Sequence, residues 1–189
     1  MKKSFIILTL AVAILAIAAC NSSSKSPHST AESDTAKTSA ANITPLATSK
    51  ALVEDYLKLK NALAKDNSDD AATAGRSLAD GFAKFDRSAL TVEQQKSFTD
   101  IADDAQEMAK HIGESAGKLP HQREHFDILS KDMYDMVKLF GAGQPLYVDR
   151  CPMYNDKKSA IWLSETKAIS NPYLGTDMPT CGIIKEELK

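Results

Sequence analysis

The sequence predicts an all-α protein, in which an irregular C-terminal segment containing cysteine and methionine packs on an antiparallel four-helix bundle. Three observations predict this fold. Apolar residues recur every three or four positions through residues 49–140. Residues that favour turns and helix ends divide that stretch into four parts. Beyond Gly141 the helical period stops, although tyrosines and the single tryptophan that follow need a surface to pack against.

The chain is expected to have three parts, with residues 1–19 as a signal peptide, 20–48 as a flexible linker and 49–189 as the folded domain. Two lysines precede an apolar run that is too short to be a comfortable membrane span. The run ends in Ile17-Ala18-Ala19-Cys20, which resembles the lipobox of bacterial lipoproteins. That resemblance implies cleavage before Cys20 and lipid attachment to it. The alternative is an ordinary signal peptide in which Cys20 is incidental.

The linker is rich in Ser, Thr, Ala, Lys and Pro and has no apolar period, so it cannot bury enough surface to fold. We expect an exported protein, anchored in the membrane through lipidated Cys20. It would lie on the periplasmic side of a bacterial membrane or at the cell surface.

The first helix is expected from Ser49 to near Asp66-Asn67-Ser68, and Asp69 or Asp70 can cap the second. Their apolar stripes are Leu52, Tyr56, Leu59 and Leu63, then Ala71, Ala74, Leu78, Phe82 and Phe85.

The third helix begins with a capping box formed by Thr91 and Gln94, and it stops around Gly113 to Gly117. Pro120 suits the first turn of the fourth helix, which Gly141 ends. The two stripes are Phe98, Ile101, Ala105, Met108 and Ile112, then Phe126, Leu129, Met133, Met136 or Val137, and Phe140. The three methionines on these stripes are expected to pack in the core rather than bind metal.

The segment 147–182 holds both cysteines of the expected mature domain. It opens with Cys151-Pro-Met153 and closes with Met178-Pro-Thr-Cys181. Thiolate and thioether sulfurs are soft ligands that select Cu(I) and similar ions. Two cysteines in an exported protein can equally form a disulfide. Of the local structure, 146–148 could be a short extended piece, and 159–163 one helical turn or a strand.

Histidines could complete a metal site. His111 lies near the end of the third helix and His125 near the start of the fourth, so antiparallel packing would bring those ends together. His121 and His125 share one helix face, but we interpret His121 as a surface residue in an easily frayed first turn. Arg123 is expected to make a structural ion pair or to hydrogen-bond the C-terminal segment.

Composition excludes several classes of function. The net charge of −2 gives no electrostatic case for binding nucleic acid. The sequence has no phosphate-binding glycine loop and no Ser/His/Asp signature. A thiol oxidoreductase would need a Cys-x-x-Cys motif, which is missing. We therefore expect a monomeric protein that is not an enzyme.

Several motifs together resemble an uncharacterised family of bacterial periplasmic domains, a domain of unknown function. They are Gln122-Arg123-x-x-Phe126, Leu129-Ser130, Tyr147-Val148, Cys151-Pro152-Met153, Trp162-Leu163-Ser164, Ile169-x-Asn171-Pro172-Tyr173 and Cys181-Gly182. Relatives of this domain occur at the ends of membrane-fusion subunits of heavy-metal efflux systems. Membership would imply an association with copper or similar ions and, as partners, metal-efflux components. Leu174 stands where an aromatic residue is expected.

The function expected from these observations is binding of a soft metal ion, copper as Cu(I), by a lipid-anchored periplasmic protein. The expected metal ligands are Cys151, Met153, Cys181, Met178, His125 and His111. The alternative is a helical protein-interaction module that binds no metal and is stapled by a Cys151–Cys181 disulfide.

Overall fold

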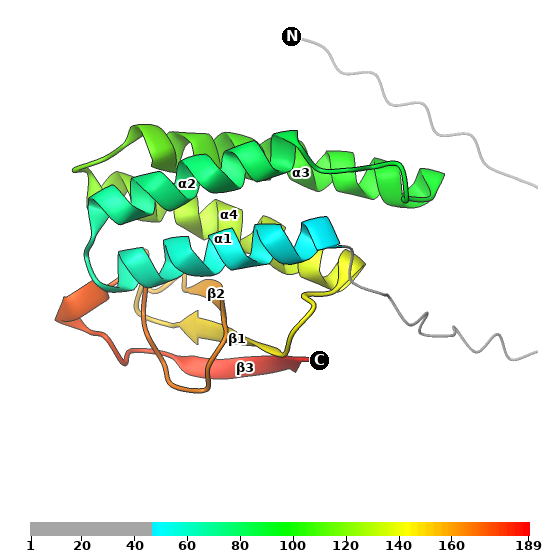
Figure 1. Ribbon diagram of the computed structural model, residues 1–189. Helices are drawn as coiled ribbons and strands as arrows, with labels where there is room; N and C mark the ends of the chain where they lie inside the picture. The colour runs from blue at the N-terminus through cyan, green and yellow to red at the C-terminus, as the bar shows by residue number, and fades with distance from the viewer. Residues whose placement is uncertain (1–46) are drawn as a thin grey trace, which may run out of the picture. The chain divides into compact units, whose positions relative to one another are not determined.

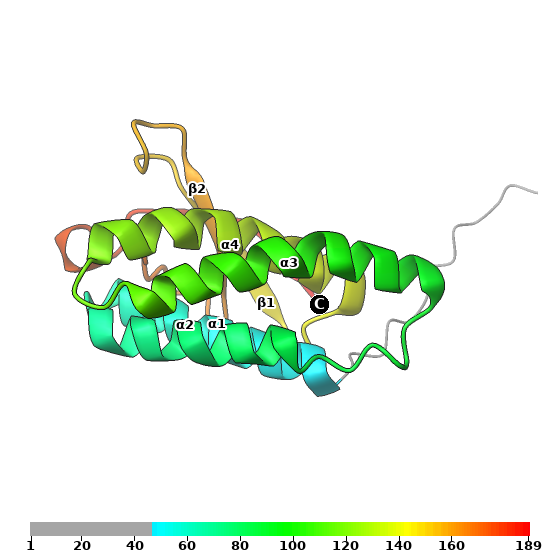
Figure 2. The same cartoon turned by 90° about the horizontal axis from the view of Figure 1, so that it is seen from above.

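The computed structural model describes residues 47–189 as four helices followed by a small sheet (Figure 1). The helices are α1 (Ala47–Ala64), α2 (Ser68–Ala83), α3 (Val92–Glu114) and α4 (Leu119–Phe140). Each helix runs antiparallel to the one before it and packs against it, and α1 also contacts α4 (Figures 1 and 2). The four-helix bundle is therefore confirmed. The expected signal peptide and Cys20 lie outside the described residues, and α1 begins two residues before the expected boundary.

Local capping signals explain where the helices begin. Thr91 accepts a hydrogen bond from the Gln94 amide at 3.2 Å, and the Gln94 side chain accepts one from the Thr91 amide at 3.0 Å. This confirms the capping box. The cap of α2 is Asn67, whose side chain accepts from the Asp70 amide at 3.0 Å, and not an aspartate as expected. Pro120 lies in the first turn of α4, as expected.

The all-α expectation is wrong, because the C-terminal segment forms a three-stranded antiparallel sheet. Its strands are β1 (Leu146–Cys151), β2 (Ala160–Ser164) and β3 (Ile183–Leu188), in the order β2-β1-β3. The extended piece expected at 146–148 and the helical turn or strand expected at 159–163 therefore both belong to strands. The strands β1 and β2 lack the alternation of apolar and polar residues that marks a sheet with one solvated face, because both are buried nearly throughout.

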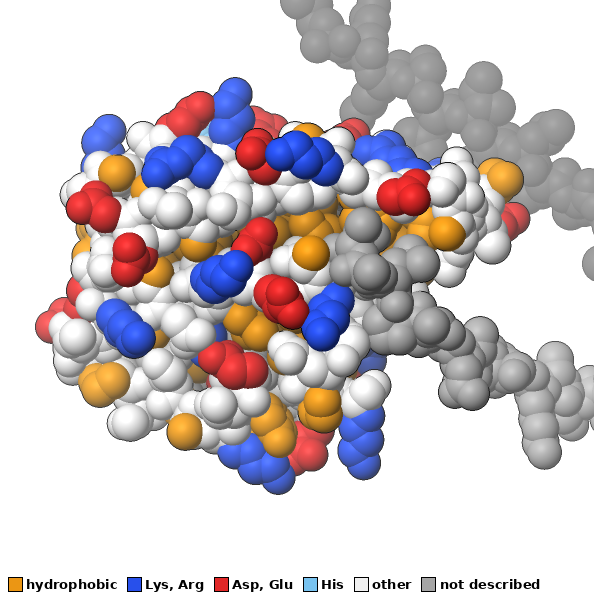
Figure 3. Space-filling view, in the orientation of Figure 1, with side chains coloured by type: hydrophobic (Ala, Val, Ile, Leu, Met, Phe, Trp, Pro, Cys, Tyr) orange, Lys and Arg blue, Asp and Glu red, His pale blue; other side chains and the backbone are white. Residues whose placement is uncertain are grey.

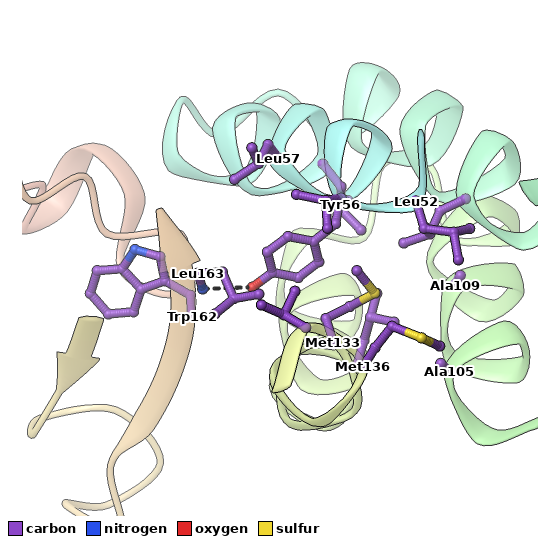
Figure 4. Packing of buried hydrophobic residues seen from close by; sticks show 14 of the residues in the cluster. Leu52, Tyr56, Leu57, Ala105, Ala109, Met133, Met136, Trp162 and Leu163 are labelled. Atoms are coloured by element: carbon purple, nitrogen blue, oxygen red, sulfur yellow. Dashed lines mark hydrogen bonds between the residues drawn. The ribbon is translucent and has the colours of Figure 1, made fainter. Parts of the chain in front are cut away.

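The sheet lies against the bundle through β2, which contacts α4 and α1. Tyr56 of α1 ties the two parts together, since its hydroxyl accepts a hydrogen bond from the Leu163 amide at 3.1 Å (Figure 4). The same hydroxyl is 2.8 Å from the Ser130 hydroxyl of α4. Met133 and Met136 are buried around this ring, which confirms their expected place in the core.

The molecular surface carries interspersed basic and acidic side chains on the face shown in Figure 3, with no large area of one sign. None of the helices in residues 47–189 combines the length and apolar character that crossing a bilayer requires.

Candidate metal centre

Two thiols meet at one end of the sheet. Cys151 is the last residue of β1 and is buried, whereas Cys181 lies two residues before β3 and is partly buried. Antiparallel pairing of Arg150 with Ile183 brings these neighbouring residues together. The two Sγ atoms are 3.5 Å apart and the cysteines are free. The structure thus brings together the two sulfurs that the sequence singles out.

Asn171 holds the backbone at Cys181 in place, a role that the sequence alone does not predict. The buried Asn171 amide nitrogen donates to the Cys181 carbonyl at 2.5 Å. Its side-chain oxygen accepts from the backbone amides of Tyr173 and Leu174 at 2.8 and 3.0 Å. Its backbone amide donates to the Pro179 carbonyl at 2.9 Å. An asparagine before a proline is a turn signal, and this turn positions the second thiol.

Gly182 lets the chain beside Cys181 approach the buried indole of Trp162. A Cβ at this position would lie 2.8 Å from an indole carbon and 3.1 Å from the Ile169 side chain. Any larger residue would push the chain away from the sheet. We infer that Gly182 is needed for the short distance between the thiols.

The thiol of Cys181 is harder to ionise than an ordinary cysteine. Loss of solvation raises its pKa, and the hydrogen bond with Cys151 raises it further. The neutral thiol therefore dominates at neutral pH. A metal ion that binds here must displace its proton.

The two predicted thioether ligands, Met153 and Met178, lie at the surface. Their side chains are 50% and 46% exposed, in contrast to the buried Met133 and Met136. Methionine is flexible, so both thioethers have freedom to turn toward an ion.

The histidines form a second cluster between α3 and α4. The rings of His111 and His125 stack with centroids 4.8 Å apart and planes 10° apart. The ring of His121 meets His125 edge-on, and their Nε2 atoms are 3.1 Å apart. Met108 is partly buried and packs against the core, and its Sδ atom is also 3.3 Å from Nδ1 of His125. His121 is exposed in the first turn of α4, as expected, and it also contacts His125.

Burial and two neighbouring imidazoles make His125 hard to protonate. Loss of solvation is the larger cause of its lowered pKa, and His121 and His111 add to it. Glu124 and Glu107 act in the opposite direction.

The histidine cluster and the thiol pair lie on different sides of α4. Arg123 and Tyr134 of α4 reach the C-terminal segment, at Pro172 and Glu186. His121 lies about half a turn around the helix from Arg123, because successive residues are about 100° apart. The two predicted histidine ligands are therefore not gathered with the two thiols. No three His, Cys, Asp or Glu side chains within residues 47–189 are already arranged around a metal position.

Arg123 makes the structural contacts expected of it. Its guanidinium forms an ion pair with Asp66 and donates to the carbonyls of Pro172 at 2.8 Å and Leu63 at 3.1 Å. Asp66 also accepts from the Thr176 amide at 2.9 Å. These contacts fasten the turn before Cys181 to the bundle. Hydrogen bonds from Thr176, followed by Arg123, hold the pKa of Asp66 below its usual value.

A buried carboxylate, Asp149 of β1, was not predicted. Neither of its oxygens has a hydrogen-bond partner among the described residues. Close by, Lys60 and Glu165 form an ion pair at 2.9 Å. Loss of solvation raises the pKa of Asp149 to about 6, although Lys60 partly opposes this.

Residues 52–145 match the model of a family described as a protein of unknown function (DUF3347). The match covers nearly all of the four helices and ends just before β1, so the thiol pair lies beyond it. This part of the chain is thus similar to an uncharacterised domain family, as the motifs predict, while the relation to efflux proteins stays a prediction. Comparisons with curated proteins and with solved structures gave no match.

Proposed function

We propose that the protein binds a soft metal ion, Cu(I) in the first place, through Cys151 and Cys181. The observation that carries the proposal is the pair of free thiols with Sγ atoms 3.5 Å apart. Two thiolates at this separation need only small side-chain movements to share one ion, and soft sulfur ligands favour Cu(I) over hard cations. Burial of Cys151 limits access of water to the bound ion.

Met153 and Met178 are supplementary ligands in this proposal. Both are exposed and close in sequence to a cysteine, so either thioether can swing over the thiol pair. The imidazoles of His111 and His125 are less suited to this role, because they lie on a different side of α4 from the segment that carries the thiols. Handling of copper or a similar heavy metal, together with efflux components, is the cellular role that the motif resemblance implies.

The same short distance supports a second candidate function, in which Cys151 and Cys181 form a structural disulfide. Forming it removes two electrons and two protons and needs an oxidant, which exported compartments supply. The disulfide would close a loop and stabilise the unit by about 3–4 kcal/mol in the chain-entropy model. The protein would then be an interaction module that binds no metal at this point.

A Cu(I) titration under anaerobic, reducing conditions tests the metal proposal. We expect one tightly bound ion per chain, and an affinity reduced by more than about 100-fold in Cys151→Ser or Cys181→Ser, because each removes a charged ligand. Met153→Leu, which removes a supplementary and uncharged ligand, should cost less than about tenfold. Affinity should fall as the pH is lowered, because protons compete for the thiolates. A double serine variant that binds Cu(I) as tightly as the parent would exclude this site.

The proposal includes a lipid anchor on Cys20, which lies outside the described residues. Attached acyl chains contribute about 0.8 kcal/mol of membrane affinity per buried methylene, so several chains anchor stably. Cys20→Ser should yield protein without lipid, as measured by mass spectrometry, and release it from the membrane fraction. Acylated, membrane-bound Cys20→Ser protein would show that the anchor is elsewhere.

A further inference from the structure

The facing nitrogens of His121 and His125 have the spacing of two ligands on one metal ion. The two residues are one helical turn apart in α4, and their Nε2 atoms are 3.1 Å apart. Zn–N bonds of 2.0–2.1 Å in a tetrahedral site place two nitrogens roughly 3.3 Å apart. Two histidines at this spacing on one helix face are a known zinc-binding arrangement.

The neighbours of the two Nδ1 atoms favour a proton on Nδ1 rather than on Nε2. Nδ1 of His121 is 3.4 Å from a Glu124 carboxylate oxygen, which can only accept a hydrogen bond. Nδ1 of His125 is 3.3 Å from the Met108 sulfur, which is also only an acceptor. With both rings neutral and both protons on Nδ1, the two Nε2 lone pairs would face each other. A cation between them removes the repulsion.

The surroundings favour a metal ion at this position. A histidine that binds metal commonly donates its other N–H to a second group, and Glu124 and Met108 are placed to receive these bonds. Carboxylates of Glu124 and Glu107 lie beside the rings and add negative charge. Imidazole ligands suit Zn²⁺, Cu²⁺ and Ni²⁺ rather than Mg²⁺ or Ca²⁺.

A third imidazole is within reach from the neighbouring helix. His111 of α3 stacks on His125, and its Nε2 is 3.6 Å from a Glu107 oxygen. Rotation of the ring would release it from Glu107 and turn a nitrogen toward the pair. The side chains of His111 and His121 are 44% and 47% exposed, so water has access to the remaining position.

We propose that His121 and His125 bind a divalent transition-metal ion of the Zn²⁺ class between their Nε2 atoms, with His111 as third ligand. This site is separate from the thiol pair and does not depend on the soft-metal proposal. It would join α3 to α4 through the metal.

Calorimetric titration of Zn²⁺ into the purified protein carrying Cys151→Ser and Cys181→Ser tests the proposal without interference from those thiols. One equivalent of Zn²⁺ should still bind. Adding His121→Gln and His125→Gln should lower the affinity by at least about 100-fold, and adding His111→Gln alone by about tenfold. The matched control is His28→Gln, which alters the remaining histidine of the sequence and should change nothing. Helical circular dichroism of each variant verifies the fold.

Three results would overturn the proposal. They are absence of Zn²⁺ uptake by the protein that lacks Cys151 and Cys181, unchanged affinity after loss of His121 and His125, and loss of binding in His28→Gln. The first result would mean that the contact between the Nε2 atoms of His121 and His125 is a hydrogen bond and not a metal site. Because Cys151 and Cys181 are absent from every sample, these results are independent of the Cu(I) titration.

Discussion

Asp149 shows how strongly one residue can act against the stability of this fold. Its carboxylate is buried in β1 without a hydrogen-bond partner among the described residues, next to the Lys60–Glu165 ion pair. Burial of a charge without a close partner disfavours the ionised form. The pKa of Asp149 in the folded state is about 6. Between about pH 4 and pH 6 the folded state therefore holds a proton that the unfolded state has already lost.

Replacement of Asp149 by asparagine is expected to stabilise the protein at neutral pH. In the parent, the free energy of unfolding should fall as the pH rises from about 4, the usual aspartate pKa, to about 6, and stay low above that. Asp149→Asn removes this loss, so its advantage at pH 7.5 should approach roughly 3 kcal/mol, while at pH 4 it should be small. Urea unfolding at both pH values measures the difference.

The exposed Asp103 provides the control for this substitution. Asp103→Asn should change the free energy of unfolding by less than about 0.5 kcal/mol at either pH. An Asp149→Asn protein less stable than the parent at pH 7.5 would show that the carboxylate has a stabilising partner.

At the scale of secondary structure, helices were predictable because their signals are local. Thr91 and Gln94 form their capping box within one turn, and Pro120 and Gly141 mark the ends of α4. Strand pairing is not local, since β1 pairs with β3 across more than thirty residues. In β3, Ile183 and Ile184 are adjacent and both exposed, so no apolar alternation identifies the strand.

The same distinction applies to the candidate site. The proximity of Cys151 and Cys181 was predictable from soft ligands at both ends of one segment. The separation of His125 from these thiols was not, because it depends on which face of α4 the sheet covers. Asn171 was visible only as a turn residue, since its hydrogen bond to Cys181 requires the folded segment.

At the scale of the whole molecule, the bundle and the sheet are joined by a few buried polar contacts as well as apolar packing. The Tyr56 hydroxyl of α1 contacts Ser130 of α4 and the Leu163 amide of β2. Arg123 of α4 joins the turn at Pro172 to the end of α1, because it donates to the Pro172 carbonyl and forms an ion pair with Asp66. The position of the thiol pair therefore depends on the helices.

Tyr56→Phe should destabilise the protein by about 1–3 kcal/mol, because it leaves the buried Leu163 amide without this acceptor and removes one of the hydrogen-bond partners of the Ser130 hydroxyl. Thermal unfolding should still be a single transition, at a lower temperature. Tyr134→Phe is the matched control, since it removes only a hydrogen bond to Glu186 that is partly exposed, and should cost less than about 1.5 kcal/mol. Equal costs for the two variants would contradict the coupling role of Tyr56.

X-ray absorption at the copper edge of the Cu(I)-loaded protein tests the central claim most directly, because it identifies the ligand atoms. Two thiolate sulfurs should dominate the first coordination shell, with room for a thioether from Met153 or Met178. The thiolate sulfur signal should disappear in the Cys151→Ser, Cys181→Ser protein. A first shell containing only nitrogen and oxygen, or one that the double substitution leaves unchanged, would contradict the assignment of Cys151 and Cys181 as a soft-metal site.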